Sequence, residues 1–349
     1  MLWKQNNRPP SVKSEPLRKA VPKLFLFCLV ILAIPAWAQD TRFFRLGTGP
    51  VDGAYFPIGG LIANAISKPP GSRDCEKGGS CGVPGLVAVA QSTSGSVANV
   101  EALYKKRLDA AIVQADIAYW AYNGSGVFAG KGAYTNLRGI AVLYPDTVHV
   151  AVRKGVKIRN VADLKGKRVA LGEPGSGTLV TARTILRAHN LKDSDLKAHY
   201  LKPGASADQM AAGELDALFV VDGAPSAIIG DLATRTAIEL LPFPAAEAER
   251  LRKASPFFIK GVLDARTYAG QDAALPVMQV GVVLLAGSEV PETLVYGITK
   301  ALWHESTLKL LASGHPNGKL IKPEKAIEGL AIQLHAGAAS YYFDAGLIK

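Results

Sequence analysis

The sequence predicts an α/β protein made of two similar domains with mainly parallel sheets. Short apolar segments alternate with amphipathic segments along the chain, which is the order of strands and helices in such folds. A chain of 349 residues that is 48% apolar and 20% charged is long enough for two domains and too apolar for disorder. A weak repeat relates 108–116 to 215–223, and each copy lies downstream of a strand that ends in a glycine-rich turn.

The N-terminal segment has the three parts of a secretory signal peptide. Residues 1–23 carry six basic side chains and one acidic side chain, an apolar run covers 24–34, and Ala36-Trp37-Ala38 follows. The run is short for a membrane-spanning helix, which needs about 20 residues, although an uncleaved anchor is the alternative. Cys28 follows Phe27, where a lipidation site requires a small residue. We therefore expect cleavage after Ala38 and export to the periplasm, with the net charge falling from +11 to +6.

The first domain begins after this segment. Its apolar runs predict strands, and its amphipathic runs predict helices, with Ser96 as the N-cap of the second helix. The expected strands cover 43–46, 86–91 and 110–114, and the expected helices cover 55–67 and 96–107. Between them lies a polar Gly/Pro-rich loop, 68–84, which contains Cys75 and Cys81. In an oxidising compartment this pair is expected to form a structural disulfide, because no His lies nearby and the spacing is not C-x-x-C.

The remaining elements continue the alternation. Two strands, 138–144 and 148–153, are expected on either side of Pro145-Asp146. A short helix, a strand and a long helix are then expected at 160–166, 168–172 and 176–191. Near the C-terminus one helix is expected from Pro291 to Leu311, followed by a helical tail over 331–347.

The repeat indicates the domain organisation. The distance from the first glycine turn to Asp116 exceeds the distance from the second turn to Asp222 by about the length of the cysteine loop, which we interpret as an insertion. The alternative is that Leu-Asp-Ala is a common helix-to-strand motif. The expected organisation is a signal peptide, 1–38, a first domain built from 39–146 plus 281–349, and a second domain, 147–280.

Catalytic signals are weak. The sequence contains no G-x-S-x-G, H-E-x-x-H, Walker or C-x-x-C motif, and its six His lack metal-ligand spacing. The turn 47–53 has the spacing G-x-G-x-x-x-G with Pro50 inside it, which does not match a dinucleotide-binding loop. We expect no enzyme activity, no cofactor and no metal site. Nucleic-acid binding is not expected either, because the chain is exported and has no concentrated basic stretch with interleaved aromatic residues.

Three turns rich in Gly, Ser and Thr carry the binding prediction. Turns 48–55, 92–96 and 173–178 each follow a strand and open a helix, so each offers hydroxyls and backbone N–H groups at a positive helix end. One such turn alone would be read as a helix cap. Three of them, at strand ends of both domains, predict a cleft for a small anionic solute. The predicted ligand-binding residues are Thr48, Gly49, Gly53, Tyr55, Phe56, Ser92, Ser94, Gly95, Ser96, Gln114, Asp116, Gly175, Ser176, Gly177, Thr178 and Asp222. Tyr55-Phe56 could cover a ligand or belong to the core.

The same motifs resemble a known family. The first turn with Gly53-Ala54-Tyr55-Phe56, the segment 91–100, the segment 113–119 and the segment 164–178 are similar, in order, to the TAXI-type solute receptors of TRAP transporters. The resemblance covers 42–349. It implies a type II periplasmic-binding-protein fold, in which two α/β domains joined by hinge strands close on a small carboxylate or amino acid such as glutamate.

The resemblance also implies a partner and a movement. Such receptors deliver their solute to an integral-membrane TRAP permease driven by an ion gradient, and we expect a monomer with hinges near 144–148 and 277–282. A receptor that signals to a membrane sensor is the alternative function. The first turn departs from the family, because Ala54 and Phe56 lack the hydroxyls of the usual Thr-Tyr-Tyr. Asp52 would repel a carboxylate unless it faces solvent or binds an amine.

Overall fold

The computed structural model describes residues 41–349, which belong to one compact unit. The expected signal peptide, 1–38, and Cys28 lie outside the described residues. Within residues 41–349, no helix is both long enough and apolar enough to cross a membrane.

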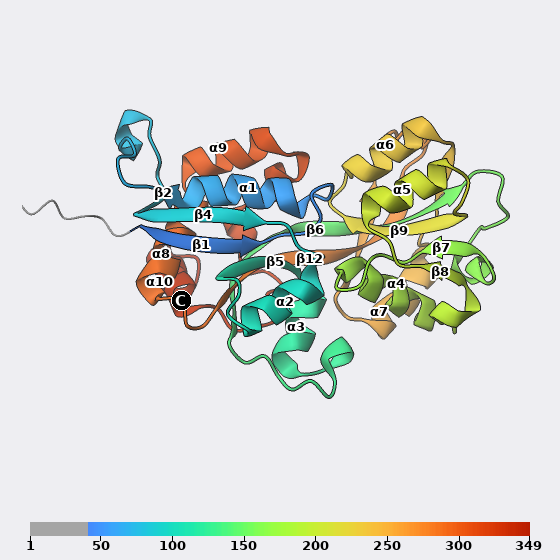
Figure 1. Ribbon diagram of the computed structural model, residues 1–349, viewed down its shortest axis with the longest axis horizontal. Coiled ribbons are helices and arrows are strands. Elements are labelled where there is room, and N and C mark those ends of the chain that lie inside the picture. Colours follow the sequence, from blue (N-terminus) through green and yellow to red (C-terminus); the bar gives the residue numbers. More distant parts are fainter. Residues whose placement is uncertain (1–40) are drawn as a thin grey trace, which may run out of the picture. The chain divides into compact units, whose positions relative to one another are not determined.

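The centre of the fold is a ten-stranded mixed sheet (Figure 1). Its main path has the order β4-β1-β5-β12-β6-β9-β7-β8, while β10 pairs with β6 and β11 pairs with β12. The strands are β1 (Arg42–Gly47), β4 (Leu86–Gln91), β5 (Ala110–Gln114), β6 (Leu137–Arg153), β7 (Arg168–Ala170), β8 (Lys197–His199), β9 (Ala217–Asp222), β10 (Ile238–Leu240), β11 (Phe258–Leu263) and β12 (Leu275–Gly287). A separate pair consists of β2 (Ser67–Lys68) and β3 (Val83–Pro84).

The sheet contains the same arrangement twice. In its first half, β1 lies between β4 and β5 in parallel, and the antiparallel β12 follows β5. In its second half, β7 lies between β8 and β9 in parallel, and the antiparallel β6 follows β9. The long strands β6 and β12 pair with each other and join the halves. This topology confirms the predicted α/β fold of the type II periplasmic-binding-protein class, whereas the domain boundaries inside it remain a prediction.

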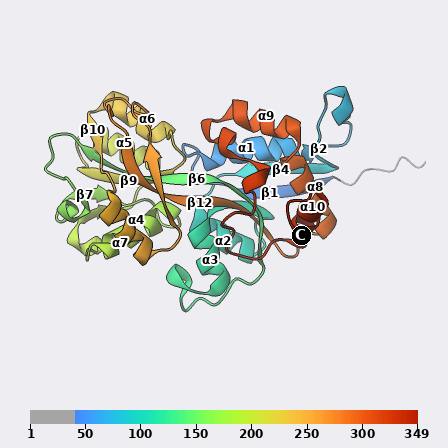
Figure 2. The same ribbon diagram turned by 180° about the vertical axis from the view of Figure 1, so that it is seen from behind.

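Helices cover both faces of each half (Figures 1 and 2). Around the first half lie α1 (Tyr55–Ile66), α2 (Ser96–Tyr104), α3 (Ala115–Asn123), α8 (Glu292–Leu302), α9 (Glu305–Gly314) and α10 (Ala336–Asp344). Around the second half lie α4 (Gly177–Ala188), α5 (Pro203–Ala211), α6 (Ala227–Arg235) and α7 (Ala245–Ala254).

The apolar periodicity of the helices explains this packing. In α1, Ile58, Ile62 and Ile66 recur every four residues, so they form one stripe that packs on Phe44 and Leu46 of β1. In the second half, Leu179, Ala182, Ile185 and Leu186 of α4 pack with Phe219 of β9. Each half therefore has its own buried clusters, and these fix the strand ends that carry the three glycine-rich turns.

One expected interruption between strands is absent. The sequence predicts two strands on either side of Pro145-Asp146, but β6 continues through both residues. Pro145 has no backbone N–H to donate to a neighbouring strand, but neither neighbouring strand requires a hydrogen bond from it. On one side it lies opposite Gly281, where β12 has a register shift, and on the other side pairing with β9 starts only at Thr147.

Two helix predictions also need correction. The helix expected from Pro291 to Leu311 is divided into α8 and α9, because His304 has an extended backbone and its Nδ1 accepts the Ser306 N–H as the cap of α9. Ser96 is not the N-cap of α2: Gly95 occupies that position, and the Ser96 hydroxyl accepts the Gln114 backbone N–H instead.

The cysteine prediction is confirmed. Cys75 and Cys81 form a disulfide, with 4.7 Å between their Cα atoms, in the loop between β2 and β3. This disulfide closes the Gly/Pro-rich loop of the first half.

Candidate functional site

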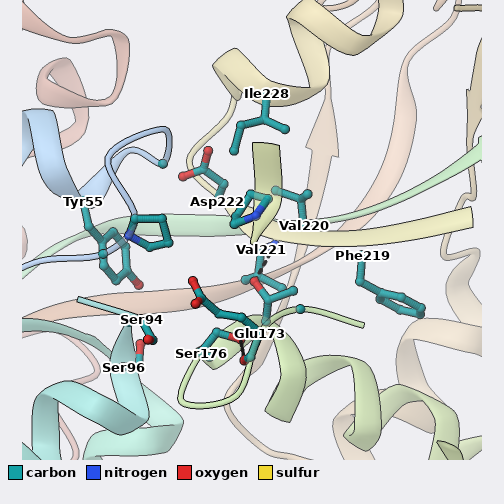
Figure 3. Close-up of a pocket in the computed structure, with 18 of the residues that line it drawn as sticks. Tyr55, Ser94, Ser96, Glu173, Ser176, Phe219, Val220, Val221, Asp222 and Ile228 are labelled. Atoms are coloured by element: carbon teal, nitrogen blue, oxygen red, sulfur yellow. Dashed lines mark hydrogen bonds between the residues drawn. The ribbon is translucent and has the colours of Figure 1, made fainter. Parts of the chain in front are cut away.

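The three predicted turns meet at one cavity between the two halves of the sheet (Figure 3). Its volume is about 60 Å³. The turn after β1 and the turn after β4 face the turn that precedes α4 and the end of β9. Predicted residues that line it are Gly49, Gly53, Tyr55, Ser94, Gly95, Ser96, Gln114, Ser176, Gly177, Thr178 and Asp222.

The other predicted residues lie outside this lining. Thr48 is fully buried and donates its hydroxyl to the Gln91 carbonyl, while Asp116 is buried and accepts the Ile117 N–H. Gly175 lies in the contact between the halves. Phe56 is half-buried on α1, and Ser92 lines a neighbouring cavity together with Asp52 and Lys202.

The structure adds lining residues that the prediction omitted. Glu173 belongs to the third turn, so its charge inside a glycine-rich segment was the signal that could have identified it. The apolar wall has no comparable signal in the sequence, because strand β9 reads as ordinary core. This wall consists of Leu201, Pro203, Phe219, Val220, Val221 and Ile228.

Glycines allow the halves to approach closely beside the cavity. A Cβ on Gly177 would lie 2.2 Å from Oε1 of Gln114, which belongs to the first half. A Cβ on Gly175 would lie 3.3 Å from Cβ of Ser94. Gly95 has a φ of 112°, which an L side chain rarely adopts, and its Cβ would lie 3.5 Å from the Ser176 Cα. These positions form a seam, defined here as Gly95, Gly175 and Gly177 with Gln114.

The seam uses the N-terminal donors of α2. The backbone N–H groups of Val97 and Ala98 both donate to the Gly175 carbonyl at 3.1 Å. The sequence predicts that donors near Ser92–Ser96 bind a solute, whereas the structure engages these two with the opposite half. The start of α2 therefore holds the halves together.

The start of α4 is capped from its own turn. Ser176 is the N-cap, and its Oγ accepts the Leu179 N–H at 3.1 Å and donates to the Glu173 carbonyl at 2.7 Å. The Thr178 hydroxyl accepts the Val221 N–H. Ser176 and Thr178 thus fix the turn against β9, while the first turn of α4 borders the cavity with its positive end.

Asp222 of the second half and Asp52 of the first half each accept a backbone N–H from the other half. Asp222 ends β9, and its Oδ1 accepts the Ala54 N–H across the cavity at 2.9 Å, while its Oδ2 accepts the Ser226 hydroxyl. Burial raises the pKa of Asp222 to about 6. From the sequence, Asp52 is expected to face solvent or to bind an amine. In the structure its Oδ2 accepts the backbone N–H of Gly204, in the first turn of α5, at 2.7 Å.

Tyr55 has a role in both the cavity and the core. Its ring lines the cavity, and its hydroxyl donates to Oδ2 of Asp146 on the crossover strand β6 at 2.7 Å. Asp146 is fully buried and its Oδ1 has no partner among the described residues. Burial, and next the charge of Asp222, raise the pKa of Asp146 well above its usual value. Tyr55 is therefore held in place by β6, one of the two strands that join the halves.

The charged groups of the cavity wall are acidic. Among the described residues, Glu173 and Asp222 line it and no Lys, Arg or His does. Burial raises the pKa of Glu173, and the nearby Lys202 opposes this shift. Oε1 of Gln114 and Oε1 of Glu173 are buried without a hydrogen-bond partner in the described structure. The wall thus offers acceptors to a donor-bearing group.

The described residues hold one group with metal-ligand geometry, and it lies elsewhere. Cys75, Cys81 and His304 have their ligand atoms within 4.8 Å of one another. Because the two sulfurs form a disulfide, neither is the thiolate that a metal requires. The sequence prediction of no metal site and no cofactor remains a prediction.

Comparisons with known proteins assign the chain to a family. The model of the NMT1-like family matches residues 46–346. A protein from Bordetella bronchiseptica RB50 is 16% identical with a TM-score of 0.50, covering 88% of this chain and 89% of its own.

Two further solved structures are similar at a lower score. The alkanesulfonate-binding protein SsuA from Xanthomonas axonopodis pv. citri, bound to MOPS, is 16% identical with a TM-score of 0.48, covering 89% of this chain and 96% of its own. PhnD1 from Prochlorococcus marinus (MIT 9301), in complex with methylphosphonate, is 14% identical with a TM-score of 0.48, covering 88% and 99%. Because the family model spans nearly all of the described residues, this chain belongs to the NMT1-like family.

Proposed function

We propose that this protein is a periplasmic receptor that captures a small solute between its two halves and presents it to a membrane permease. The observation that carries the proposal is the cavity itself: it lies where the halves meet, and both halves supply its wall. Contacts between the halves surround it, from Ala54 to Asp222, from Asp52 to Gly204 and from α2 to Gly175.

This arrangement supports binding by closure. A solute that touches both walls binds the closed form better than the open form, so it shifts the population toward closure. The long strands β6 and β12 are the connections that would bend, in agreement with the hinges expected near 144–148 and 277–282. No chemical step is assigned to the site, and the receptor acts by binding alone.

The wall favours an amino acid over a simple carboxylate. A carboxylate would lie at the positive end of α4, beside Gly177 and Thr178. An ammonium group would lie near Oε1 of Glu173 and the side-chain Oε1 of Gln114, two buried acceptors without a hydrogen-bond partner in the described structure. A cavity of about 60 Å³ has room for only about four to six water-sized groups, so in this form the cavity restricts the solute to a small one.

The proposed partner is the TRAP-type permease that the family resemblance implies. An importer driven by ATP is the other possible acceptor, and a membrane sensor that transmits a signal is the third. The energy source distinguishes them. With purified permease in proteoliposomes, uptake that collapses when the ion gradient is dissipated and persists without ATP supports the TRAP assignment, whereas uptake that requires ATP refutes it.

Binding itself is tested on the exported protein. Native mass spectrometry of protein purified from the cell envelope should show a bound species that is released on denaturation. Titration calorimetry of refolded protein with L-glutamate, L-glutamine and 2-oxoglutarate should then show tighter binding of the two amino acids. If neither a co-purified solute nor binding of any low-molecular-weight metabolite is detected, the receptor proposal is wrong.

A further inference from the structure

A second cavity lies at the crossover strands and shares no lining residue with the first. Its volume is about 550 Å³, within the range of about 300–1,000 Å³ that is usual for small-molecule sites. Tyr144 and Pro145 of β6 and Gly281 of β12 line it, and these are the positions expected to act as hinges. It is therefore bordered by the strands that join the halves.

The cavity wall is apolar and comes from both halves. Ile259 on β11 belongs to the second half and is 49% exposed, while Leu320 belongs to the segment after α9 and is 44% exposed. Phe257 lines the same cavity, and its ring lies 5.1 Å from the Tyr119 ring and 6.3 Å from the Trp120 ring of α3. Large apolar side chains that converge while exposed indicate a site for an apolar group.

The lining also carries basic charge. Lys322 and Lys325 line the cavity and are exposed, and neither has an ion-pair partner in residues 41–349. Glu328 also lines the cavity, so its lining has two positive charges and one negative charge. An apolar body beside an excess of unpaired ammonium groups is complementary to an amphipathic anion.

We propose that this hinge cavity binds a free aliphatic monocarboxylate, with its chain between Ile259, Leu320 and Phe257 and its carboxylate at Lys322 and Lys325. This proposal is independent of the solute bound in the first cavity. Because the wall includes residues of both halves and of β6 and β12, a ligand bound here would lie between the halves and against the strands that join them.

Titration calorimetry with octanoate, decanoate and dodecanoate tests the proposal. Affinity should rise about fourfold for each added methylene group until the cavity is filled, as expected for burial of apolar area. Decanoate should bind more tightly than decanol, and decanol more tightly than decyltrimethylammonium. Equal affinity for the three head groups, or no binding of any of them at millimolar concentration, would overturn the assignment.

Variants locate the site. Ile259→Asp should weaken decanoate binding about tenfold or more, because it removes apolar contact area. The double variant Lys322→Glu, Lys325→Glu should weaken it about tenfold; both lysines are changed together because one exposed ion pair contributes little. Lys319→Glu is the matched control: this exposed lysine lies in the same segment but outside the cavity, and its effect should stay within about twofold. If all variants bind decanoate like the unmodified protein, decanoate binds elsewhere and the proposal is wrong. The unchanged thermal unfolding midpoint of each ligand-free variant would exclude misfolding as the cause.

Discussion

Replacement of Gly177 by Ala tests whether the seam controls closure. Gly177 is the first residue of α4, and its backbone has no positive φ, so Ala is acceptable to the helix itself. The added Cβ would nevertheless lie 2.2 Å from Oε1 and 2.5 Å from Cδ of Gln114. Gln114 is 2% exposed, so it has little room to move. The substitution therefore opposes contact between the halves without opposing the fold of either.

The expected magnitude follows from the cost of overpacking, which is about 1–3 kcal/mol. If this cost falls on the closed form alone, solute affinity drops about 5- to 150-fold. Calorimetry with L-glutamate, or with the solute that co-purifies, measures the drop. Urea unfolding of the ligand-free variant should give a free energy of unfolding no lower than that of the unmodified protein.

A double-mutant cycle identifies the cause. Gln114→Ala removes the side chain that the new methyl group meets, so Gly177→Ala should cost much less affinity in that background than alone. The coupling between the two substitutions should account for most of the 1–3 kcal/mol. Wild-type affinity of Gly177→Ala, or strictly additive effects of the two changes, would refute the seam as a determinant of closure.

Three further predictions concern polar side chains of the first half. Asp52→Ala removes the acceptor of the Gly204 N–H and should weaken solute binding about fivefold, as expected for a lost helix-capping contact of about 1 kcal/mol, and calorimetry checks it. Tyr55→Phe leaves the buried Asp146 without its donor and should lower the free energy of unfolding by about 1–3 kcal/mol, whereas Tyr104→Phe, on an exposed ring, should have no effect in urea titrations. Burial raises the pKa of Asp116 to about 6 in the folded protein, so its favourable contribution exists below pH 4 and is lost as the pH rises through 6. The stability gained by Asp116→Asn should therefore grow between pH 4 and pH 6, by up to about 3 kcal/mol, and stay constant above; a pH-independent difference would show that the carboxyl is not desolvated.

Local sequence patterns were sufficient for several elements between β1 and α4. Strands β4 and β5 begin and end where the apolar runs do, and α1 ends one residue before its predicted limit. Predictions failed at one place where a distant partner decides the local structure, and at another where a local side-chain cap was overlooked. The β12 register shift opposite Pro145 keeps β6 continuous, and the interaction of His304 with the Ser306 N–H divides α8 from α9.

The candidate site shows the same division. The glycine-rich turns could be identified because a turn that opens a helix needs Gly, Ser or Thr at fixed positions, and these turns do meet at the first cavity. The acidic character of its wall could not be identified from spacing. Asp222 and Glu173 lie far apart in sequence from Gln114, and only folding places their acceptors around one space.

The sequence by itself therefore determined the alternation of strands and helices, the repeated architecture, the disulfide and the turns that line the cavity, because these depend on periodicity and on residue type over short distances. The tertiary structure alone decided which donors remain available, since the start of α2 is engaged with Gly175 and Asp52 caps α5. It also alone revealed the hinge cavity, whose wall combines Ile259, Leu320 and Lys322. Contacts between residues distant in the chain have no local pattern, so only the packed structure shows them.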